Sequence, residues 1–168
     1  MITYIDRPET IKRFKKEHEQ FFTLVSSLSE KTVQKPNTLG NWSVKDIVAH
    51  LAAWNWEVLD EAIRILNNQA SWPDRYEGNK GEDEFNKKGI ARRKNMSWKE
   101  VLKDWDDSFW AEIKQMENFS ESEWRHQSDT QCWADGSPVT VYSLYAYEYE
   151  GEGHEGGHGK QILKKFTT

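Results

Sequence analysis

Residues 41–54, NWSVKDIVAHLAAW, contain both the start of a helix and the first candidate functional side chain. Ser43 and Asp46 form an S-x-x-D capping box, and Trp42 before the cap can pack on the first turns as a hydrophobic staple. Apolar side chains then recur at helical spacing, at Ile47, Leu51, Trp54 and Val58. His50 lies on the same face, so this pattern predicts a helix that carries a histidine into the protein core.

Two further segments have the same helical character. Near the N-terminus, Asp6 and Glu9 form a capping pattern with Pro8 in the first turn. The stripe that follows contains Ile11, Phe14, His18, Phe21, Val25 and Leu28. Residues 96–100, MSWKE, start another helix with a capping box of Ser97 and Glu100. Its stripe contains Leu102, Trp105, Phe109, Ile113 and Met116.

A fourth helix is predicted to begin near Thr140 and to continue into residues 151–162, GEGHEGGHGKQI. Its stripe contains Leu144, Tyr147, Gly151, His154, His158 and Ile162. A glycine in a helix interior is unfavourable by about 1 kcal/mol relative to alanine, so propensity alone does not shape this glycine-dense segment. We expect packing of its ends and metal ligation to hold it, with the glycines clearing room for a substrate.

A long polar connection, residues 67–95, separates the second helix from the third and is expected to cross over with some helix of its own around residues 82–93. Evidence for strands is poor, because residues 137–147 run directly into helical spacing and no alternating partner segment is visible. The sequence therefore predicts an all-α protein in which residues 1–168 form one four-helix bundle with a long connection between helices 2 and 3.

Bulk composition restricts the classes of partner. The chain has 23 basic and 28 acidic side chains, a net charge of -5, and no run of lysine or arginine, so we expect no nucleic-acid partner. No window approaches the ~20 apolar residues of a bilayer span, and residues 1–10 lack a signal-peptide pattern, so no membrane association is expected. The single cysteine, Cys132, is consistent with a reducing, cytoplasmic location.

The distribution of the histidines is the most informative functional signal. Of the five, only His126 falls in a polar loop, and the others lie on or beside apolar stripes. His154 and His158 are one helical turn apart, with Cβ atoms roughly 5–6 Å from each other. Together with His50 they can supply three neutral imidazoles to a divalent metal ion, zinc or nickel, with positions left for water or substrate. The alternative is that each is a core histidine with a satisfied hydrogen bond.

The letters HEGGH, residues 154–158, also match the H-E-x-x-H motif of metalloproteases. The context does not support a protease, because only ten residues follow His158 and none of them can supply the usual third ligand. Glu155 is therefore expected to be solvated or to support the metal ligands rather than to act as a general base.

Aromatic side chains are unusually frequent, with nine tryptophans in 168 residues. Five of them are candidates for the wall of an aromatic pocket near the histidines, namely Trp54, Trp56, Trp105, Trp110 and Trp133. His18 and Tyr147 are further pocket candidates. The alternative for any one of these residues is a purely structural place in the core.

At this point the order and spacing of the motifs resemble those of a known family. The pattern W-S-x-x-D-x-x-x-H-L-x-x-W at residues 42–54, followed by HEGGHGKQI at residues 154–162, is similar to the DinB/YfiT-like bundle superfamily. The opening residues 7–30 and the block at residues 40–54 look most like its DfsB/ClbS-like branch. The resemblance implies a four-helix bundle with an open metal site at His50, His154 and His158. It also implies a hydrolase, an isomerase or a thiol-dependent transferase, and the branch includes a resistance protein that opens an electrophilic cyclopropane.

These observations favour a metal-dependent enzyme that acts on a small electrophilic substrate, as a hydrolase or as a transferase that uses a low-molecular-weight thiol. Two other classes stay open. One is a non-catalytic protein that sequesters a hydrophobic electrophile in an aromatic pocket. The other is a structural bundle that forms a homodimer through an exposed apolar face, with vestigial histidines.

Overall fold

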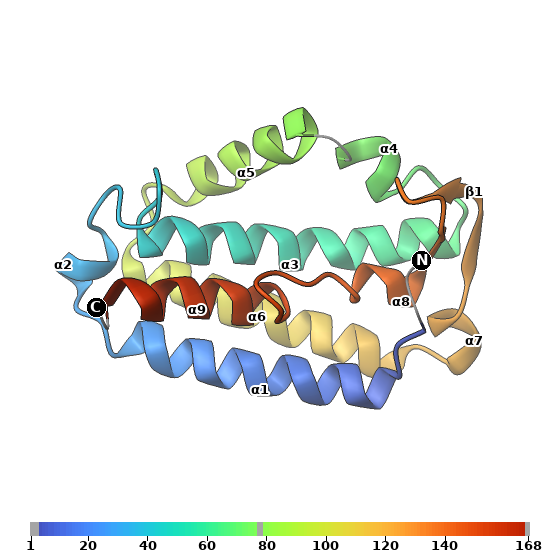
Figure 1. Cartoon of the computed structure of the whole chain (residues 1–168), viewed down its shortest axis with the longest axis horizontal. Coiled ribbons are helices and arrows are strands. Elements are labelled where there is room, and N and C mark those ends of the chain that lie inside the picture. Colours follow the sequence, from blue (N-terminus) through green and yellow to red (C-terminus); the bar gives the residue numbers. More distant parts are fainter. Residues whose placement is uncertain (1–3, 77–78, 167–168) are drawn as a thin grey trace.

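Four long helices form a bundle in the computed structural model, which describes residues 4–76 and 79–166. They are α1 (Arg7–Ser26), α3 (Val44–Leu66), α6 (Trp98–Asn118) and α9 (His154–Phe166). Figure 1 shows them side by side, with α1 and α9 running in one direction and α3 and α6 in the other. The predicted all-α class and four-helix bundle are confirmed.

The predicted starts of the first three long helices are also confirmed. Ser43 and Asp46 form a complete capping box before α3, and Ser97 and Glu100 form one before α6. The Asp6 side chain accepts a hydrogen bond from the backbone N–H of Glu9 at the start of α1. These three helices therefore begin where a local side chain satisfies free N–H groups of the first turn.

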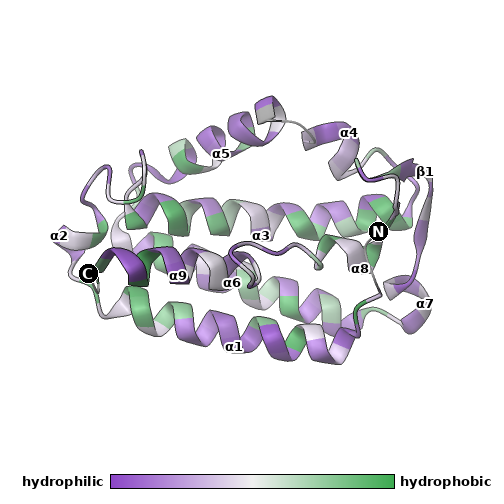
Figure 2. Ribbon diagram, in the orientation of Figure 1, coloured by the Kyte–Doolittle hydropathy of each residue, from purple (hydrophilic) through white to green (hydrophobic). Residues whose placement is uncertain are grey.

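The connection between α3 and α6 contains the expected helix. After α4 (Trp72–Tyr76), α5 (Asn79–Arg93) runs antiparallel to α3 and packs on it, which allows α3 and α6 to be parallel. Arg75 and Tyr76 both bind the Glu57 carboxylate, each at 2.7 Å, which attaches α4 to α3. Figure 2 shows that α5 is mostly hydrophilic, as expected for a helix outside the bundle core.

The region before α9 differs from the predicted continuous helix. A short helix, α8 (Val141–Leu144), begins after Thr140 as expected but ends within one turn. Glu150 and Gly151 both have positive φ, at 55° and 74°, and form a tight turn closed by two backbone hydrogen bonds between Tyr149 and Glu152. The helix cannot continue through this turn, so the glycine-rich segment is helical only from His154 onward.

A small sheet also lies in this region, although the sequence contains little evidence for strands. Between α6 and the sheet is the short helix α7 (Glu121–Trp124), and another short helix, α2 (Glu30–Val33), follows α1. Strands β1 (Gln127–Cys132) and β2 (Pro138–Thr140) pair antiparallel around a turn in which Gly136 has a φ of 78°. The strand signal was missed because β1, QSDTQC, is polar and has no clear alternation.

The core runs along the inner faces of the four long helices, where hydrophobic side chains face one another (Figure 2). Trp105 of α6 and Phe21 of α1 are among its largest buried side chains. Within the described residues, no helix has the length and apolar character needed to cross a lipid bilayer. Residues 1–3 of the N-terminal stretch considered above lie outside the described residues.

Candidate metal centre and aromatic cavity

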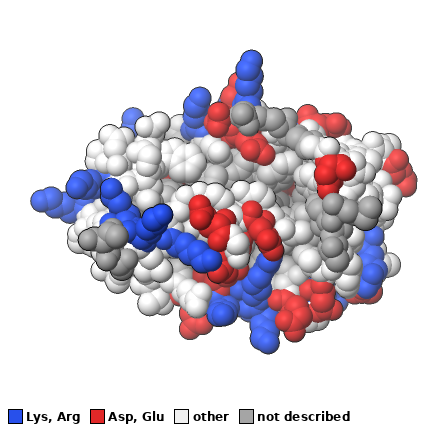
Figure 3. Space-filling view, viewed as in Figure 1, with Lys and Arg blue, Asp and Glu red and all other residues white. Residues whose placement is uncertain are grey.

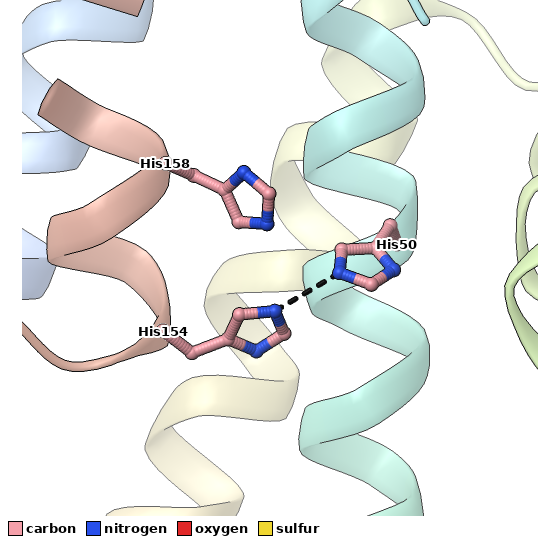
Figure 4. A group of neighbouring side chains, drawn as sticks. All are labelled: His50, His154 and His158. Carbon is pink, nitrogen blue, oxygen red and sulfur yellow. Dashed lines mark hydrogen bonds between the residues drawn. The ribbon is translucent and has the colours of Figure 1, made fainter. Parts of the chain in front are cut away.

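The structure brings the three predicted metal ligands together. His50 projects from α3, and His154 and His158 project from successive turns of α9 (Figure 4). The Nε2 atoms of His50 and His154 are 2.9 Å apart, and one ligand nitrogen from each of the three histidines lies within 4.8 Å of the other two. Residues 104 positions apart in the sequence therefore meet because α3 and α9 are antiparallel neighbours.

Two amide side chains orient these imidazoles. Asn86 of α5 places its Oδ1 2.9 Å from Nδ1 of His50, and Gln161 of α9 places its Oε1 3.0 Å from Nδ1 of His158. An amide oxygen can only accept, so each Nδ1 carries the proton and each Nε2 presents its lone pair. Hydrogen bonds of this kind are typical of metal-binding histidines.

Burial keeps the three imidazoles neutral. It lowers the pKa of His50 to about 3, with a further contribution from the charge of His158. Burial also lowers the pKa of His158 to about 4. The pKa of His154 is well below its usual value because the ring is buried beside the other two histidines. Neutral imidazole is the form that binds a metal ion, so the site needs no deprotonation at neutral pH.

The histidines line a cavity of about 320 Å³ inside the bundle. Its walls are largely aromatic, and Trp54 stacks on Trp72 of α4 with ring centres 4.3 Å apart. The lining residues are Phe14, Glu17, Trp42, His50, Trp54, Asn55, Val58, Trp72, Glu82, Asn86, Phe109, Glu112, Leu144, Tyr145, Tyr147, Tyr149, His154, Glu155 and His158. The volume is that of a small-molecule site.

Of the seven pocket candidates, two line the cavity and five, including Trp133, do not. Trp54 and Tyr147 line the cavity, whereas His18 and Trp105 are buried behind its wall. Of the other tryptophans considered, Trp56 and Trp110 are exposed, and the cavity instead uses Trp42 and Trp72. Helical spacing placed Trp105 on an inner face, but it could not distinguish the core from a cavity within it.

His18 and Trp105 hold Glu155, the middle residue of HEGGH. The Glu155 carboxylate lies 3.0 Å from Nδ1 of His18 and accepts a 2.6 Å hydrogen bond from Nε1 of Trp105. Burial acts to lower the pKa of His18, but bonding to Glu155 and Asp106 outweighs it and the net pKa is raised. Glu155 is therefore buried and bound between two side chains rather than solvated.

The glycines before and within α9 make room for protein groups rather than for a substrate. A Cβ at Gly153 would lie 2.4 Å from Oε2 of Glu17, whose carboxylate accepts a hydrogen bond from the Gly153 N–H at 3.1 Å. A Cβ at Gly157 would lie 2.4 Å from the backbone oxygen of Tyr149. The expectation that the glycines clear substrate space is corrected, because α1 and the loop before α9 occupy that space.

Several lining residues had no clear signal in the sequence. Asn86 lies in the polar connection, where nothing marked it as a neighbour of His50. Glu112 and Asn55 are polar residues that border apolar stripes, and this placement is the one feature that could have indicated buried roles.

The donor set fits a borderline divalent ion. Three neutral nitrogen ligands without a carboxylate suit zinc or nickel. Tetrahedral bonds of about 2.0–2.1 Å would place the ligand nitrogens roughly 3.3 Å apart. The observed separations, from 2.9 Å to at most 4.8 Å, bracket that value, so side-chain adjustments alone would complete the site.

Solved structures of similar fold include two proteins of known role. One is the colibactin self-resistance protein ClbS in complex with a dsDNA, with a TM-score of 0.72 and 13% identity over 96% of this chain and 95% of that chain. The other is the mycothiol-dependent maleylpyruvate isomerase, with a TM-score of 0.62 and 13% identity over 95% of this chain and 59% of that chain. The likeness to ClbS agrees in fold with the branch that the motifs resemble.

The exclusion of nucleic acid is wrong. The ClbS structure is a complex with dsDNA on this fold, so a net charge of -5 does not rule out such partners. Net charge is an average, and Figure 3 shows lysine and arginine side chains gathered at the end of the molecule where α9 ends. Lys160, Lys164 and Lys165 line a second hollow there, of about 730 Å³, beside the metal centre.

The family follows from the sequence itself. A search of curated proteins found no match to this chain. The model of the DinB superfamily matches residues 13–162, which include all four long helices in whole or in large part and all three histidines of the candidate metal centre. The chain belongs to the DinB superfamily.

Proposed function

We propose that this protein is a metal-dependent enzyme that acts on a small electrophilic molecule held in the aromatic cavity. One observation carries the proposal: three converging neutral histidines line the wall of a cavity instead of being enclosed by the core. Three protein ligands leave coordination positions open, which is typical of catalytic rather than structural metal sites.

A divalent ion bound there would act as a Lewis acid and would lower the pKa of a coordinated water or thiol towards neutrality. The protein residues have separate roles. Asn86 and Gln161 hold the imidazoles of His50 and His158 through Nδ1, which leaves each Nε2 available to bind an ion. The stacked rings of Trp54 and Trp72 provide a flat apolar surface that favours an aromatic or apolar substrate.

Hydrolysis and thiol transfer remain equal alternatives. The mycothiol-dependent isomerase of similar fold supports a role for a thiol. The described lining residues of the cavity include no lysine or arginine that would mark a site for an anionic thiol. Proteolysis is disfavoured, because Glu155 of the HEGGH motif is engaged by His18 and Trp105 and the cavity is largely aromatic.

The test uses protein purified without a histidine tag. We expect one zinc or nickel ion per chain by elemental analysis, and turnover of a reactive epoxide or cyclopropane that is abolished in His154→Ala. Assays with and without a low-molecular-weight thiol separate transferase from hydrolase.

His18→Gln is the matched control, since His18 is a buried histidine outside the triad. His18→Gln should keep the metal. Retention of stoichiometric metal by His50→Ala would contradict the assignment of His50 as a metal ligand. If His154→Ala protects against the electrophile as well as the parent protein does, sequestration replaces catalysis.

A further inference from the structure

Two buried polar side chains of the cavity lack a protein partner. Asn55 of α3 is 7% exposed. Its Nδ2 is enclosed without a hydrogen-bond acceptor, and its Oδ1 accepts no hydrogen bond from the described residues. Glu112 of α6 is 5% exposed, and its carboxyl group makes no hydrogen bond within the described part of the chain. Both line the cavity. Because unpaired buried polar groups are unfavourable for folding, those that persist in a cavity are candidates for ligand contacts.

The two side chains start from the same level of the bundle. Gln115 of α6 donates a 2.9 Å hydrogen bond from Nε2 to the backbone oxygen of Leu59 of α3. Asn55 is one turn before Leu59, and Glu112 is one turn before Gln115. Since α3 and α6 are parallel, Asn55 and Glu112 lie on neighbouring turns and form what we call the polar pair.

The polar pair lies beyond the metal centre along α3. Asn55 is five residues after His50, which corresponds to about 7.5 Å along a helix axis. Apolar residues surround this part of the cavity, including Phe14, Val58 and Leu144. A small molecule could therefore reach the polar pair with one end while its other end lies at the histidines.

The charges of the cavity restrict what the polar pair can bind. Four glutamates and no lysine or arginine are among the lining residues, so an anionic group finds no counter-charge. Glu17 is occupied by the Gly153 N–H and Glu155 by His18 and Trp105. Burial, with the charge of Glu155, raises the pKa of Glu112 well above its usual range, so its carboxyl group is uncharged and favours an uncharged ligand group.

We propose that Asn55 and Glu112 form a specificity subsite for a carboxamide group of the substrate. The O–H of the Glu112 carboxyl group donates to the amide oxygen, and Oδ1 of Asn55 accepts from the amide N–H. This inference rests on the proposed function, because it takes the cavity as the substrate site. It assigns the substrate class as a flat, largely apolar molecule with an uncharged amide at the end remote from the reacting group.

Four matched indoles test the subsite: indole-3-acetamide, tryptamine, indole-3-acetate and 3-ethylindole. They carry an amide, an ammonium, a carboxylate or no polar group on the same ring. We expect the acetamide to bind at least about tenfold more tightly than 3-ethylindole, as measured by calorimetry or ligand-observed NMR. Asn55→Leu and Glu112→Met should reduce this preference to less than about twofold, whereas Glu112→Gln should keep most of it.

Thermal unfolding separates a binding role from a structural one. Replacing a residue that is needed for folding would lower the melting temperature. Removing an unpaired buried polar group should leave the melting temperature unchanged or raise it, so we expect this result for Asn55→Leu and Glu112→Met.

The titrations are run on metal-free protein, on metal-loaded protein and on His154→Ala. A failure of metal-dependent catalysis would leave the amide preference intact, so the two proposals can fail separately. Tightest binding of tryptamine, or an unchanged amide preference in Asn55→Leu, would overturn the carboxamide subsite.

Discussion

At the scale of single residues, two buried histidines of this protein have pKa values that are shifted in opposite directions. His18 gains two carboxylate partners, Asp106 and Glu155, each with an oxygen 3.0 Å from a ring nitrogen, and its pKa is raised. His50 faces an amide and other imidazoles, and its pKa is lowered to about 3. The partners of each ring therefore decide whether the net pKa of a buried histidine is raised or lowered.

The lowered pKa values predict that metal-free protein loses stability in mild acid. Below the unfolded-state pKa of about 6.5, the unfolded chain binds protons that the folded triad does not, so stability falls as pH drops. For His50 and His158 the expected loss from pH 7 to pH 5 is about 2 kcal/mol each, as an order of magnitude. His18 acts in the opposite sense, because its raised pKa adds stability that is present at low pH and lost as pH rises.

Urea unfolding at pH 7, 6 and 5, with EDTA present, measures this loss. His158→Gln should show a shallower dependence than the parent protein, because one buried neutral imidazole has been removed. If the free energy of unfolding depends on pH equally in the two proteins, the three histidines are solvated and have pKa values close to that of free histidine.

At the scale of elements, the start of α9 is held by α1 and by the preceding loop. The Glu17 carboxylate accepts a hydrogen bond from the N–H of Gly153, one residue before α9 begins. Tyr149 packs against the first turn, where Gly157 leaves space for its backbone. Close approach, rather than helix propensity, explains why glycine is suited to these positions.

Two glycines of α9 should therefore respond in opposite ways to alanine. A Cβ at Gly157 would lie 2.4 Å from the Tyr149 backbone oxygen, whereas a Cβ at Gly159 would make an ordinary contact of 3.4 Å with Phe21. We expect Gly159→Ala to stabilise the protein by up to about 1 kcal/mol through helix propensity. Gly157→Ala should destabilise it by about 1–3 kcal/mol, because the loop must move.

The matched pair is compared by urea unfolding under one condition. A stabilising Gly157→Ala would mean that the Tyr149 loop is not packed on α9 in solution.

At the scale of the whole molecule, the candidate metal centre links α3 to α9, two helices that are far apart in the sequence. An ion bound to all three histidines binds the folded state but has no preformed site in the unfolded chain. At a free zinc concentration of 100 times the dissociation constant, the expected stabilisation is about 2.7 kcal/mol. For a chain of this size, that corresponds to a rise in melting temperature of roughly 5–10 °C.

Differential scanning calorimetry with and without zinc measures this shift. His50→Ala and His154→Ala should lose it, while His18→Gln should keep it. A shift of the same size in all three variants would place the ion elsewhere.

The sequence by itself determined the bundle and the identity of the converging histidines. The Ser43 and Ser97 capping boxes and the apolar stripes are local signals, because a helix start depends on residues three or four positions away. His154 and His158, one turn apart, were likewise readable as a pair. His50 could be matched to them because its stripe had to face the same core.

Only the tertiary structure decided what surrounds those histidines. The turn at Glu150 and Gly151, the cavity walls at Trp42 and Trp72, and the buried partners of Glu155 all depend on segments distant in the sequence. Periodicity identifies which side chains face inward, but it cannot tell a filled core from a cavity, since the difference lies in how side chains from several helices meet. The placement of Glu112 and Asn55 without partners was visible only once all four helices were packed together.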